Sequence, residues 1–311
     1  MKIVFMGTPD FAVPSLEMLV NEGYEVAAAV TQPDKPKGRG NKLTAPPVKE
    51  FALKHGINVL QPEKIKTPEF IEQIRLLKPD LLITAAYGKI LSKDLLEVPS
   101  RGCINVHGSL LPSYRGAAPI NWAVINGEKK TGITTMFTDV GLDTGDMLLK
   151  KELEISADMT VGELHNKMAI LGAEVLKETL FELKNGTLKR IPQEDAESTY
   201  APMMNKELGL IDWNKTAQEV HNLVRGTDPW PGAYTFLNGN RMRVWKTSLT
   251  NDKNNGHTNG YIIKVSNEGI LVKCSDENIL IEEVQFDSSK RMSVRDYIRG
   301  HQIDAGEILG K

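Results

Sequence analysis

Two residues near the middle of the chain are of types that could act together on a carbonyl group. Asn105 and His107 lie in the run "GCINVHGSLLPSYRG", whose first residues have the composition of a buried strand. Residues two apart on an extended strand face the same side, so a carboxamide and an imidazole are expected side by side. The imidazole can give or take a proton near neutral pH, and the amide can donate a fixed hydrogen bond to an oxyanion. The pair would suit attack on a carbonyl carbon, where negative charge develops on oxygen.

The same pair also has a purely structural explanation. Asn105 could satisfy backbone groups of the following loop, and His107 could be a buried, hydrogen-bonded histidine. For two residues alone this explanation is the stronger one, so the catalytic interpretation needs a third group. Ser109 and Tyr114 follow closely, but neither lies in a G-x-S-x-G sequence, which argues against a serine-type nucleophile.

The third group is expected in the segment "DVGLDTGD", which contains Asp139, Asp143 and Asp146. A carboxylate beside an imidazole fixes its tautomer and favours the imidazolium form at neutral pH. Aspartates are also common turn formers, and spacing alone does not choose among the three.

A sheet is needed to hold these residues at one edge. Apolar runs at "KIVFMG", "EVAAAVTQ", "DLLITAAYG" and "GCINVH" are predicted strands, with helical patterns between them, and two more strands are predicted at "GITTMFTD" and "DMLLKKELEI". The alternation of strand and helix predicts an α/β fold with a mostly parallel, Rossmann-like sheet. Ligands bind such sheets beyond the carboxyl ends of the strands, where Gly7, Tyr87–Gly88 and His107–Gly108 fall.

Local signals mark where helices start and stop. Pro14 suits the first turn of a helix that Gly23 closes. Capping boxes of the form T-x-x-E occur at Thr160–Glu163 and at Thr216–Glu219. The first predicts a long helix and the second predicts a short one.

The pattern of apolar and polar residues changes after the predicted long helix. Residues 186–206 are polar and show neither a helical nor a strand period, so they are predicted to be a linker. Short β-like runs follow, separated by glycine and asparagine, and they predict a small β-barrel of oligonucleotide-binding type. The expected organisation is a catalytic α/β domain over residues 1–185, a linker over 186–206 and a barrel domain over 207–311.

Composition removes several classes of protein. Hydrophobic residues make up 41% and charged residues 25%, which is ordinary for a globular protein. The formal net charge of -2 gives no overall attraction to nucleic acid. Residues 205–311 hold 14 Lys plus Arg and 14 Asp plus Glu, which argues against a non-catalytic RNA-binding protein built on that domain alone.

Cofactor and compartment signals are equally plain. Cys103 and Cys274 belong to no CxxC pair and imply neither a disulfide framework nor a zinc site. Gly7 begins "GTPDFA", which is not G-x-G-x-x-G, because Pro9 takes the place of the second glycine; a nicotinamide-dependent enzyme is therefore not expected. No signal peptide or membrane span is expected, so the cytoplasm is the expected compartment.

Several segments resemble the formyltransferases that use 10-formyltetrahydrofolate. "INVHGSLLPSYRGAAPINWAVINGEKKTGIT" and "DVGLDTGDML" carry the Asn-x-His pair, the "SLLP" segment and the "LDTG" turn of that family. "MGTPDFAVPSLE", "VTQPDKPKGRGNKLTAPPVKE" and "IDWNKTAQEVHNLVRGTDPWPGAY" are similar to the methionyl-tRNA formyltransferases within it. The similarity covers nearly the whole chain, and the motifs occur in order at the expected spacings. Gly108 is a small departure, because alanine is commoner there.

The resemblance implies a mechanism and a set of site residues. The donor would be 10-formyltetrahydrofolate, with no metal involved, and the acceptor would be initiator methionyl-tRNA, with the enzyme acting as a monomer in translation initiation. Asn105, His107 and Asp143 would be catalytic. The implied folate contacts are Ser109, Leu110, Leu111 and Pro112, together with Tyr87, Gly88 and Ile90 in the loop after an earlier strand. A chain ending near Asn205 is expected to keep folate binding and to lose most activity on tRNA.

The nearest alternative is a sugar-nucleotide N-formyltransferase, which shares the catalytic domain and can carry a similar second domain. A glycinamide ribonucleotide formyltransferase would lack the last hundred or so residues, and a formyl-folate hydrolase would carry an extra domain before the first strand. The cationic loop 34–49 favours tRNA, since such a loop can neutralise phosphates of an acceptor stem but has no evident use beside a small sugar; a plain surface loop is the other explanation. The tRNA contacts expected there are Lys35, Lys37, Arg39 and Lys42.

Overall fold

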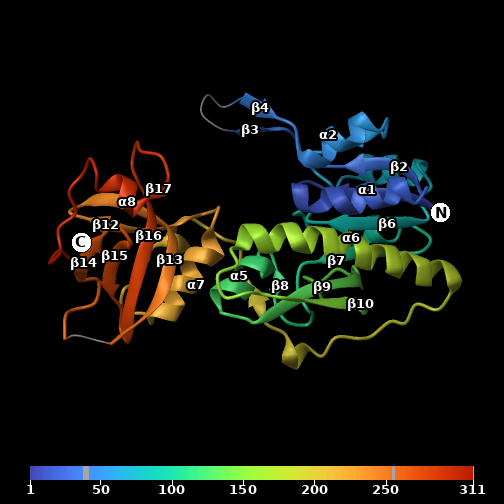
Figure 1. The fold of residues 1–311 in the computed structure, drawn as a ribbon. Coiled ribbons are helices and arrows are strands. Elements are labelled where there is room, and N and C mark those ends of the chain that lie inside the picture. The colour runs from blue at the N-terminus through green and yellow to red at the C-terminus, as the bar shows by residue number, and fades with distance from the viewer. Residues whose placement is uncertain (38–41, 254–255, 311) are drawn as a thin grey trace. The chain divides into compact units, whose positions relative to one another are not determined.

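The protein folds into two compact units, and each is described here by itself (Figure 1). The structure is a computed structural model that describes residues 1–37, 42–253 and 256–310. Unit 1 comprises Met1–Pro119, Lys130–Glu154 and His165–Pro202, and unit 2 comprises Ile120–Lys129, Ile155–Leu164 and Met203–Lys311. The chain therefore passes from one unit to the other several times. Unit 1 is not a single stretch of sequence, unlike the expected domain 1–185.

Unit 1 is built on a seven-stranded sheet in the order β10-β9-β7-β6-β1-β2-β5. Parallel ladders join β5, β2, β1, β6 and β7, and β9 alone runs the opposite way, pairing antiparallel with both β7 and β10. Their bounds are β1 (Lys2–Gly7), β2 (Glu25–Val30), β5 (Val59–Leu60), β6 (Leu81–Ala85), β7 (Cys103–His107), β9 (Lys130–Phe137) and β10 (Met147–Glu154). The predicted mostly parallel α/β sheet is confirmed.

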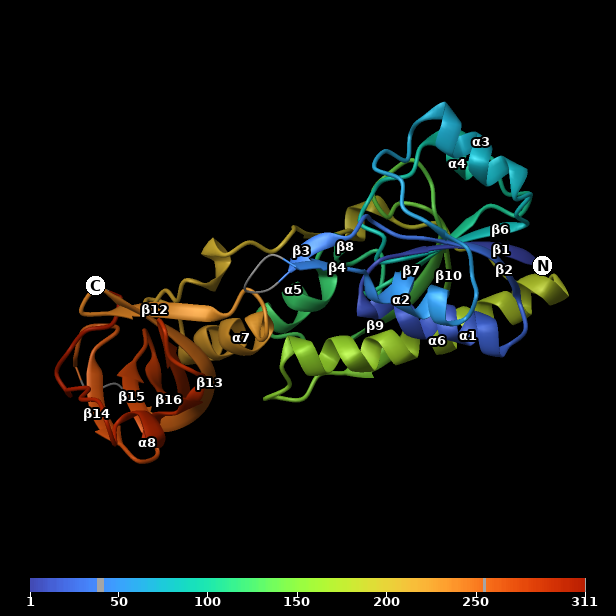
Figure 2. The same ribbon diagram turned by 90° about the horizontal axis from the view of Figure 1, so that it is seen from above.

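Continuous apolar runs mark the strands that are covered on both faces. All of Ile3–Met6 in β1 is fully buried, and β6 is buried along its whole length. One face carries α3 (Pro68–Leu76) and α4 (Lys93–Leu96), whose buried side chains cluster with Val4 and Met6. The opposite face carries α1 (Val13–Asn21), α2 (Pro47–Lys54) and the part of α6 (Val161–Asn185) that belongs to unit 1 (Figure 2).

The helix signals in the sequence are confirmed by the hydrogen bonds at the helix ends. Pro14 lies in the first turn of α1, and Gly23, with φ of +72°, follows its last turn. In the capping box at the start of α6, Thr160 N–H donates to Glu163 at 2.9 Å and Glu163 N–H donates to Thr160 Oγ1 at 3.3 Å. Thr216 and Glu219 form the same reciprocal pair at the start of α7 (Ala217–Thr227).

The polar stretch expected as a linker lies along unit 1 as far as Pro202. Ile191 forms an antiparallel bridge with Met147. The short strands β8 (Arg115–Gly116) and β11 (Tyr200–Ala201) pair in parallel, with the 3-10 turn η2 (Asp195–Glu197) just before β11. This stretch therefore forms backbone hydrogen bonds with two separate parts of unit 1.

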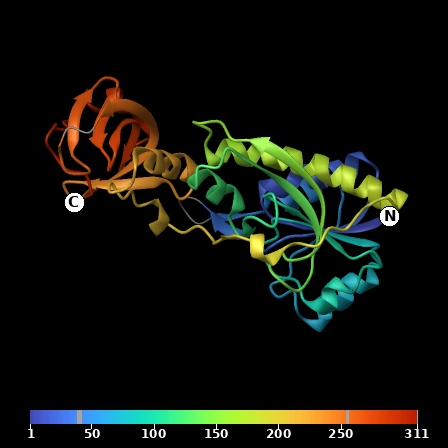
Figure 3. The same cartoon turned by 90° about the horizontal axis from the view of Figure 1, so that it is seen from below.

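The large C-terminal part of unit 2 is an antiparallel sheet in the order β12-β13-β16-β15-β14, with β17 added beside β16. Its strands curl round a core that also receives α7 (Figure 3). Main-chain bonds from the C-terminal segment bridge the two edges: Gly310 N–H donates to Phe236 of β12, and Leu309 N–H donates to Gly260, just before β14. The strands and remaining helices are β12 (Ala233–Leu237), β13 (Asn240–Lys253), β14 (Ile262–Ser266), β15 (Gly269–Lys273), β16 (Glu277–Phe286), β17 (Met292–Ser293), η3 (Glu207–Gly209) and α8 (Val294–Tyr297). The predicted small barrel is confirmed.

Within the described part of the chain, no helix is both long enough and apolar enough to span a membrane.

Candidate active site

The carboxyl end of β7 presents the two residues that the strand period placed on one side. Asn105 is half-buried, and its Oδ1 accepts a hydrogen bond of 2.8 Å from Thr84 Oγ1 on the neighbouring strand β6. This contact follows from register, because Thr84 and Asn105 are paired in the parallel ladder. It fixes the orientation of the amide, so that Nδ2 is the group that Asn105 can offer as a donor.

His107 uses its two ring nitrogens in different ways. The side chain is buried, with 5% of its surface exposed. Nε2 lies 3.0 Å from the carbonyl oxygen of Tyr114, and a carbonyl can only accept, so Nε2 carries the proton. Nδ1 faces Asp143 Oδ2 at 3.7 Å, which is within ion-pair distance but longer than a hydrogen bond. Nδ1 is therefore the ring nitrogen whose protonation can change without loss of the Tyr114 contact.

The structure separates the three aspartates of the turn. Asp139 stays within the turn, where it accepts from Gly141 N–H at 3.0 Å and from Thr144 Oγ1 at 2.8 Å. Asp146 pairs with Arg190 at 2.8 Å. Of the three, Asp143 is the one whose carboxylate faces the His107 ring. The turn thus brings Asp143, and neither of the other two, to the end of β7.

Asp143 is held at its carboxylate and in an unusual backbone conformation. Oδ2 accepts a 2.8 Å hydrogen bond from Gly116 N–H. The Asp143 φ of +53° lies in the left-handed region, which is uncommon for residues with a side chain. Gly116 has φ of +119°, and a Cβ there would lie 2.6 Å from the carbonyl oxygen of Ala201, so only glycine fits the position that meets Asp143.

Sequence reasoning missed Gln193 and Arg115, which together hold this turn. Gln193 donates from Nε2 to the carbonyl oxygens of Asp143 at 2.8 Å and Gly145 at 2.7 Å. Its Oε1 accepts from Arg115 Nε at 3.0 Å. Gln193 lies in the non-periodic stretch expected as a linker, where no pattern distinguishes it from its polar neighbours.

The "SLLP" segment is itself fixed by buried hydrogen bonds. Ser109 is fully buried and donates to the carbonyl of Ser113 at 2.6 Å, while its own carbonyl accepts from Thr134 Oγ1 at 2.7 Å. Leu111 is buried against Met136 and Met147. The side chains of Ser109 and Leu111 are therefore used inside the protein, whereas Leu110 and Pro112 are only half-buried.

The loop after β6 combines one buried and one exposed apolar residue. Tyr87 is buried, its hydroxyl has no hydrogen-bond partner among the described residues, and burial raises the pKa of that hydroxyl to about 12. Gly88 has φ of +79°, and a Cβ there would lie 2.8 Å from Gln32 Nε2. Ile90 is exposed. Tyr87 packs in the core beneath the loop, and the exposed Ile90 is the side chain that a bound ring system could cover.

The cationic loop forms a two-stranded hairpin of β3 (Lys35–Lys37) and β4 (Lys42–Thr44). Lys35 is exposed and bonds Gln32 Oε1 at 2.9 Å, and Lys42 is exposed on the opposite strand. Lys37 pairs through its backbone with Lys42. Arg39, the fourth expected tRNA contact, lies outside the described residues.

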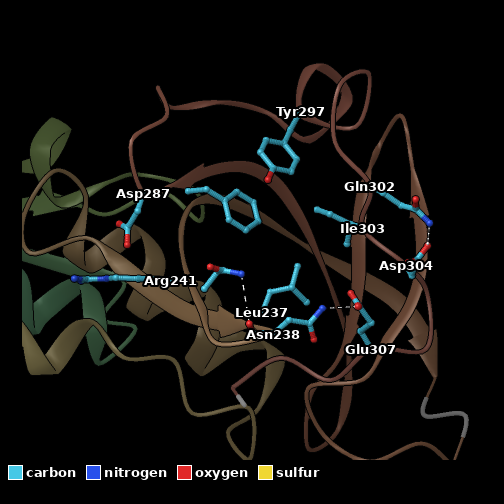
Figure 4. A pocket seen from close by; sticks show the side chains of 11 residues that line it. Leu237, Asn238, Arg241, Asp287, Tyr297, Gln302, Ile303, Asp304 and Glu307 are labelled. Atoms are coloured by element: carbon cyan, nitrogen blue, oxygen red, sulfur yellow. Dashed lines mark hydrogen bonds between the residues drawn. The ribbon is translucent and has the colours of Figure 1, made fainter.

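Other candidate sites are few. Among the described residues, no group of three or more His, Cys, Asp or Glu side chains is arranged to hold a metal ion. A cavity of about 520 Å³ lies in unit 2, and it contains none of the expected site residues (Figure 4). Polar side chains on its wall partner one another: Asn238 donates to Glu307 at 2.6 Å and Gln302 donates to Asp304 at 2.7 Å.

Comparison with known proteins places both parts of the chain. The family model described as "Formyl transferase" matches residues 1–180, and "Formyl transferase, C-terminal domain" matches residues 203–302. A solved N-formyltransferase from Helicobacter canadensis, in complex with folinic acid and dTDP-3-aminofucose, has a TM-score of 0.67 at 20% identity, covering 90% of this chain and 98% of its own. At that identity the likeness shows the fold alone.

Two curated relatives are much closer and cover the full length of both chains. They are the methionyl-tRNA formyltransferases of Ruminiclostridium cellulolyticum, 75% identical over 312 residues, and of Acetivibrio thermocellus, 64% identical over 311 residues. Because both family models and these full-length relatives agree, the chain belongs to the formyltransferase family, in the group of the methionyl-tRNA formyltransferases.

Proposed function

We propose that the protein transfers the formyl group of 10-formyltetrahydrofolate to the amino group of initiator methionyl-tRNA, with Asn105, His107 and Asp143 as the catalytic residues. The observation that carries this assignment is the meeting of an amide, an imidazole and a carboxylate at the end of β7, where Asp143 lies 3.7 Å from His107. The choice of methionyl-tRNA as the acceptor rests on the two relatives of 75% and 64% identity, which are methionyl-tRNA formyltransferases.

The reaction forms one C–N bond and breaks another. As the amine of methionyl-tRNA attacks the formyl carbon, the carbonyl oxygen takes up negative charge. The Asn105 amide, oriented by Thr84, donates a hydrogen bond to that oxygen, and protonated His107 stabilises it electrostatically. The attacking nitrogen then gives up a proton, N10 of the folate accepts one, and the C–N10 bond breaks. Formylated methionyl-tRNA and tetrahydrofolate leave with no net change in protons.

Tyr114 and Asp143 each contact one ring nitrogen of His107. The Tyr114 carbonyl fixes Nε2, so the proton that moves during the reaction is the one on Nδ1. Asp143 faces Nδ1 and stabilises the imidazolium, which gives its Nδ1 proton toward the leaving nitrogen. The Asp143 carboxylate helps to take the proton from the attacking amine, so acid and base work are divided between the ring and the carboxylate.

The folate donor would lie over the ends of β6 and β7. Leu110, Pro112 and Ile90 present apolar surface to it, and Tyr87 supports the loop from within the core. Ser109 and Leu111 shape the segment from within rather than contacting the ligand by their side chains, and Gly88 allows close approach of the loop. These residues fit a flat, partly apolar donor.

The remaining assignments follow the acceptor. Lys35, Lys37, Arg39 and Lys42 of the loop 34–49 would contact tRNA phosphates, and residues 207–311 would form the tRNA-binding domain after the catalytic domain 1–185. A monomer acting in the cytoplasm is the assembly and setting that we propose.

The test is formylation of methionyl-tRNA by the purified protein with 10-formyltetrahydrofolate, with a dTDP-amino sugar as the competing acceptor. We expect formylmethionyl-tRNA and no formylated sugar. Formylation of the sugar alone would overturn the choice of acceptor and leave the catalytic residues in place, whereas product from neither would overturn the formyl-transfer assignment.

A further inference from the structure

Gln193 makes an unusually complete set of hydrogen bonds for a residue in an irregular segment. Both of its amide hydrogens are used, one on the Asp143 carbonyl at 2.8 Å and one on the Gly145 carbonyl at 2.7 Å. Its amide oxygen accepts from Arg115 Nε at 3.0 Å. A surface linker residue would bond to water instead, so this side chain belongs structurally to the Asp143 turn.

The turn needs a partner of this kind because its backbone is in an unfavourable conformation. Asp143 has φ of +53°, and a non-glycine residue in this region is stable only when its surroundings hold it there. The next glycine, Gly145, is packed so closely that a Cβ would lie 1.9 Å from the carbonyl oxygen of Phe137. Gln193 bonds the carbonyls on both sides of this constriction, and so resists rotation of the Asp143 peptide.

Arg115 fixes the orientation of the Gln193 amide. It is 9% exposed, and because its Nε can only donate, the amide oxygen must point toward it and the amide nitrogen toward the turn. A second contact of Arg115, Nη2 to Asp195 Oδ1 at 2.8 Å, is an ion pair that is not aligned as a hydrogen bond. Arg115 is followed in β8 by Gly116, whose N–H binds the Asp143 carboxylate. One short segment thus holds Asp143 directly through Gly116 and indirectly through Gln193.

We propose that Gln193 is a positioning residue for formyl transfer: it fixes the Asp143 peptide so that the carboxylate faces His107 Nδ1. The inference rests on the proposed catalytic role of Asp143. It goes further by assigning a function to the irregular stretch 190–201, which would complete the active site by closing over the back of the catalytic turn.

The chemistry of the contact requires glutamine. A glutamate at this position keeps an acceptor for Arg115 but has no N–H for the two carbonyls, and its charge would repel both oxygens. An asparagine is one methylene shorter and cannot reach the turn from the same backbone position. Gln193→Glu is therefore the most specific replacement, and Gln193→Ala removes the contact without adding charge.

The experiment measures kcat and both KM values for the full-length chain carrying Gln193→Ala or Gln193→Glu, with Glu194→Ala as the matched control. Glu194 is the exposed neighbour on the same segment. We expect kcat to fall by about tenfold to a hundredfold, the effect of misplacing a catalytic group by roughly 1 Å, with KM for methionyl-tRNA and for the folate donor within about twofold. The control should retain the parent kcat.

A double-mutant cycle with Asp143→Asn shows whether Gln193 acts through Asp143. If it does, adding Gln193→Ala to Asp143→Asn lowers kcat by less than about twofold further. An equal loss in both backgrounds, or a parent kcat in both Gln193 variants, would overturn the inference and leave the proposed function intact. Parent kcat in Asp143→Asn itself would instead overturn the catalytic role of Asp143, and with it the role of Gln193.

Discussion

The three catalytic candidates can be tested one side chain at a time. Replacing His107 with alanine or Asp143 with asparagine is expected to lower kcat by about two powers of ten, the size of a lost general acid–base contribution. Asp146→Asn is the matched control, because it removes a carboxylate from the same turn that pairs with Arg190 instead of His107. Initial rates of methionyl-tRNA formylation measure the effect, and thermal melting checks that the fold persists. Equal losses in Asp143→Asn and Asp146→Asn would mean that the turn is disturbed generally.

A second histidine gives a pH-dependent prediction about stability. His221 of α7 is buried between the Ala157 carbonyl at 3.2 Å and Thr247 Oγ1 at 3.0 Å. Burial is the main cause that lowers its pKa, and the charge of Arg225 adds to it, although the hydrogen bond with the Ala157 carbonyl and the charge of Asp158 act in the opposite direction. The unfolded chain therefore binds this proton more readily than the folded chain. The contribution of His221 to the free energy of unfolding is complete above about pH 6.5 and is lost as the pH falls below that value.

This prediction is checked by comparing chemical denaturation at pH 7.5 and pH 5. His221→Gln is expected to lose less stability between the two values than the parent chain, because glutamine does not titrate. His301→Gln, at an exposed histidine, is the control and should follow the parent chain. An identical pH dependence in all three proteins would remove His221 as the source.

Residue-level prediction from sequence succeeded where one strand set the geometry. Asn105 and His107 share a side because side chains alternate along β7, and that rule needs no tertiary information. The choice of Asp143 depended on a turn with positive φ and on bonds to Gly116 and Gln193, which are 27 and 50 residues away in sequence. No spacing rule reports such contacts, and here only resemblance to a family pointed to Asp143.

At the scale of elements, regular strands and helices could be predicted from local sequence patterns, whereas irregular segments could not. Buried parallel strands such as β1 and β6 were predictable because they are continuously apolar, and the capping boxes located the starts of α6 and α7. The polar stretch 186–206 is predicted from sequence to be a linker because the two-residue strand and the side-chain bonds within it leave no periodic pattern. Its contacts with unit 1 had to be seen in the structure.

The β3–β4 hairpin is the element on which the tRNA proposal can be tested. Replacing Lys37, Arg39 and Lys42 with serine is expected to raise KM for methionyl-tRNA without changing folate binding. If each side chain neutralises one phosphate, the slope of log affinity against log salt should flatten by about 2 to 3 units. Filter binding over a range of salt concentrations measures that slope.

The matched control removes three positive charges elsewhere on unit 1. Lys130, Lys151 and Lys177 each pair with a glutamate on the protein. Replacing all three with serine removes three positive charges, the same change in net charge as in the hairpin variant. This variant should keep the salt dependence of the parent chain. Equal flattening in both variants would mean that net charge, and not the hairpin, governs tRNA binding.

At the scale of the whole molecule, unit 2 is assembled from three separate stretches of sequence. Arg225 of α7 is buried and donates to the carbonyls of Met159 at 3.3 Å and Val124 at 3.4 Å. Gly226 packs so closely that a Cβ would lie 2.5 Å from Ile125 Cγ1. Residues 120–129 and 155–164 therefore depend on α7 for their packing, although they precede it by many residues in sequence.

A chain that ends at Asn205 would keep every proposed folate contact. It would lack α7, against which residues 120–129 and 155–164 pack. The truncation removes the Arg225 hydrogen bonds to the Met159 and Val124 carbonyls, and each buried carbonyl left unsatisfied costs about 1–3 kcal/mol. That total is a large part of the roughly 5–15 kcal/mol that stabilises a typical domain. We therefore expect the truncated chain to melt about 10 °C or more below the full chain. Below its melting temperature it should still bind the folate donor, and it should have lost most formylation of methionyl-tRNA.

Calorimetry of the two chains, with folate binding measured at a temperature where both are folded, separates the possible causes. A lower melting temperature with folate binding retained supports the dependence of the two segments on α7, together with the placement of the folate site in unit 1. Unchanged melting would show that residues 120–129 and 155–164 pack equally well without α7. Loss of folate binding in a chain that remains folded would place part of the donor site beyond residue 205, and would contradict the assignment of that site to the ends of β6 and β7.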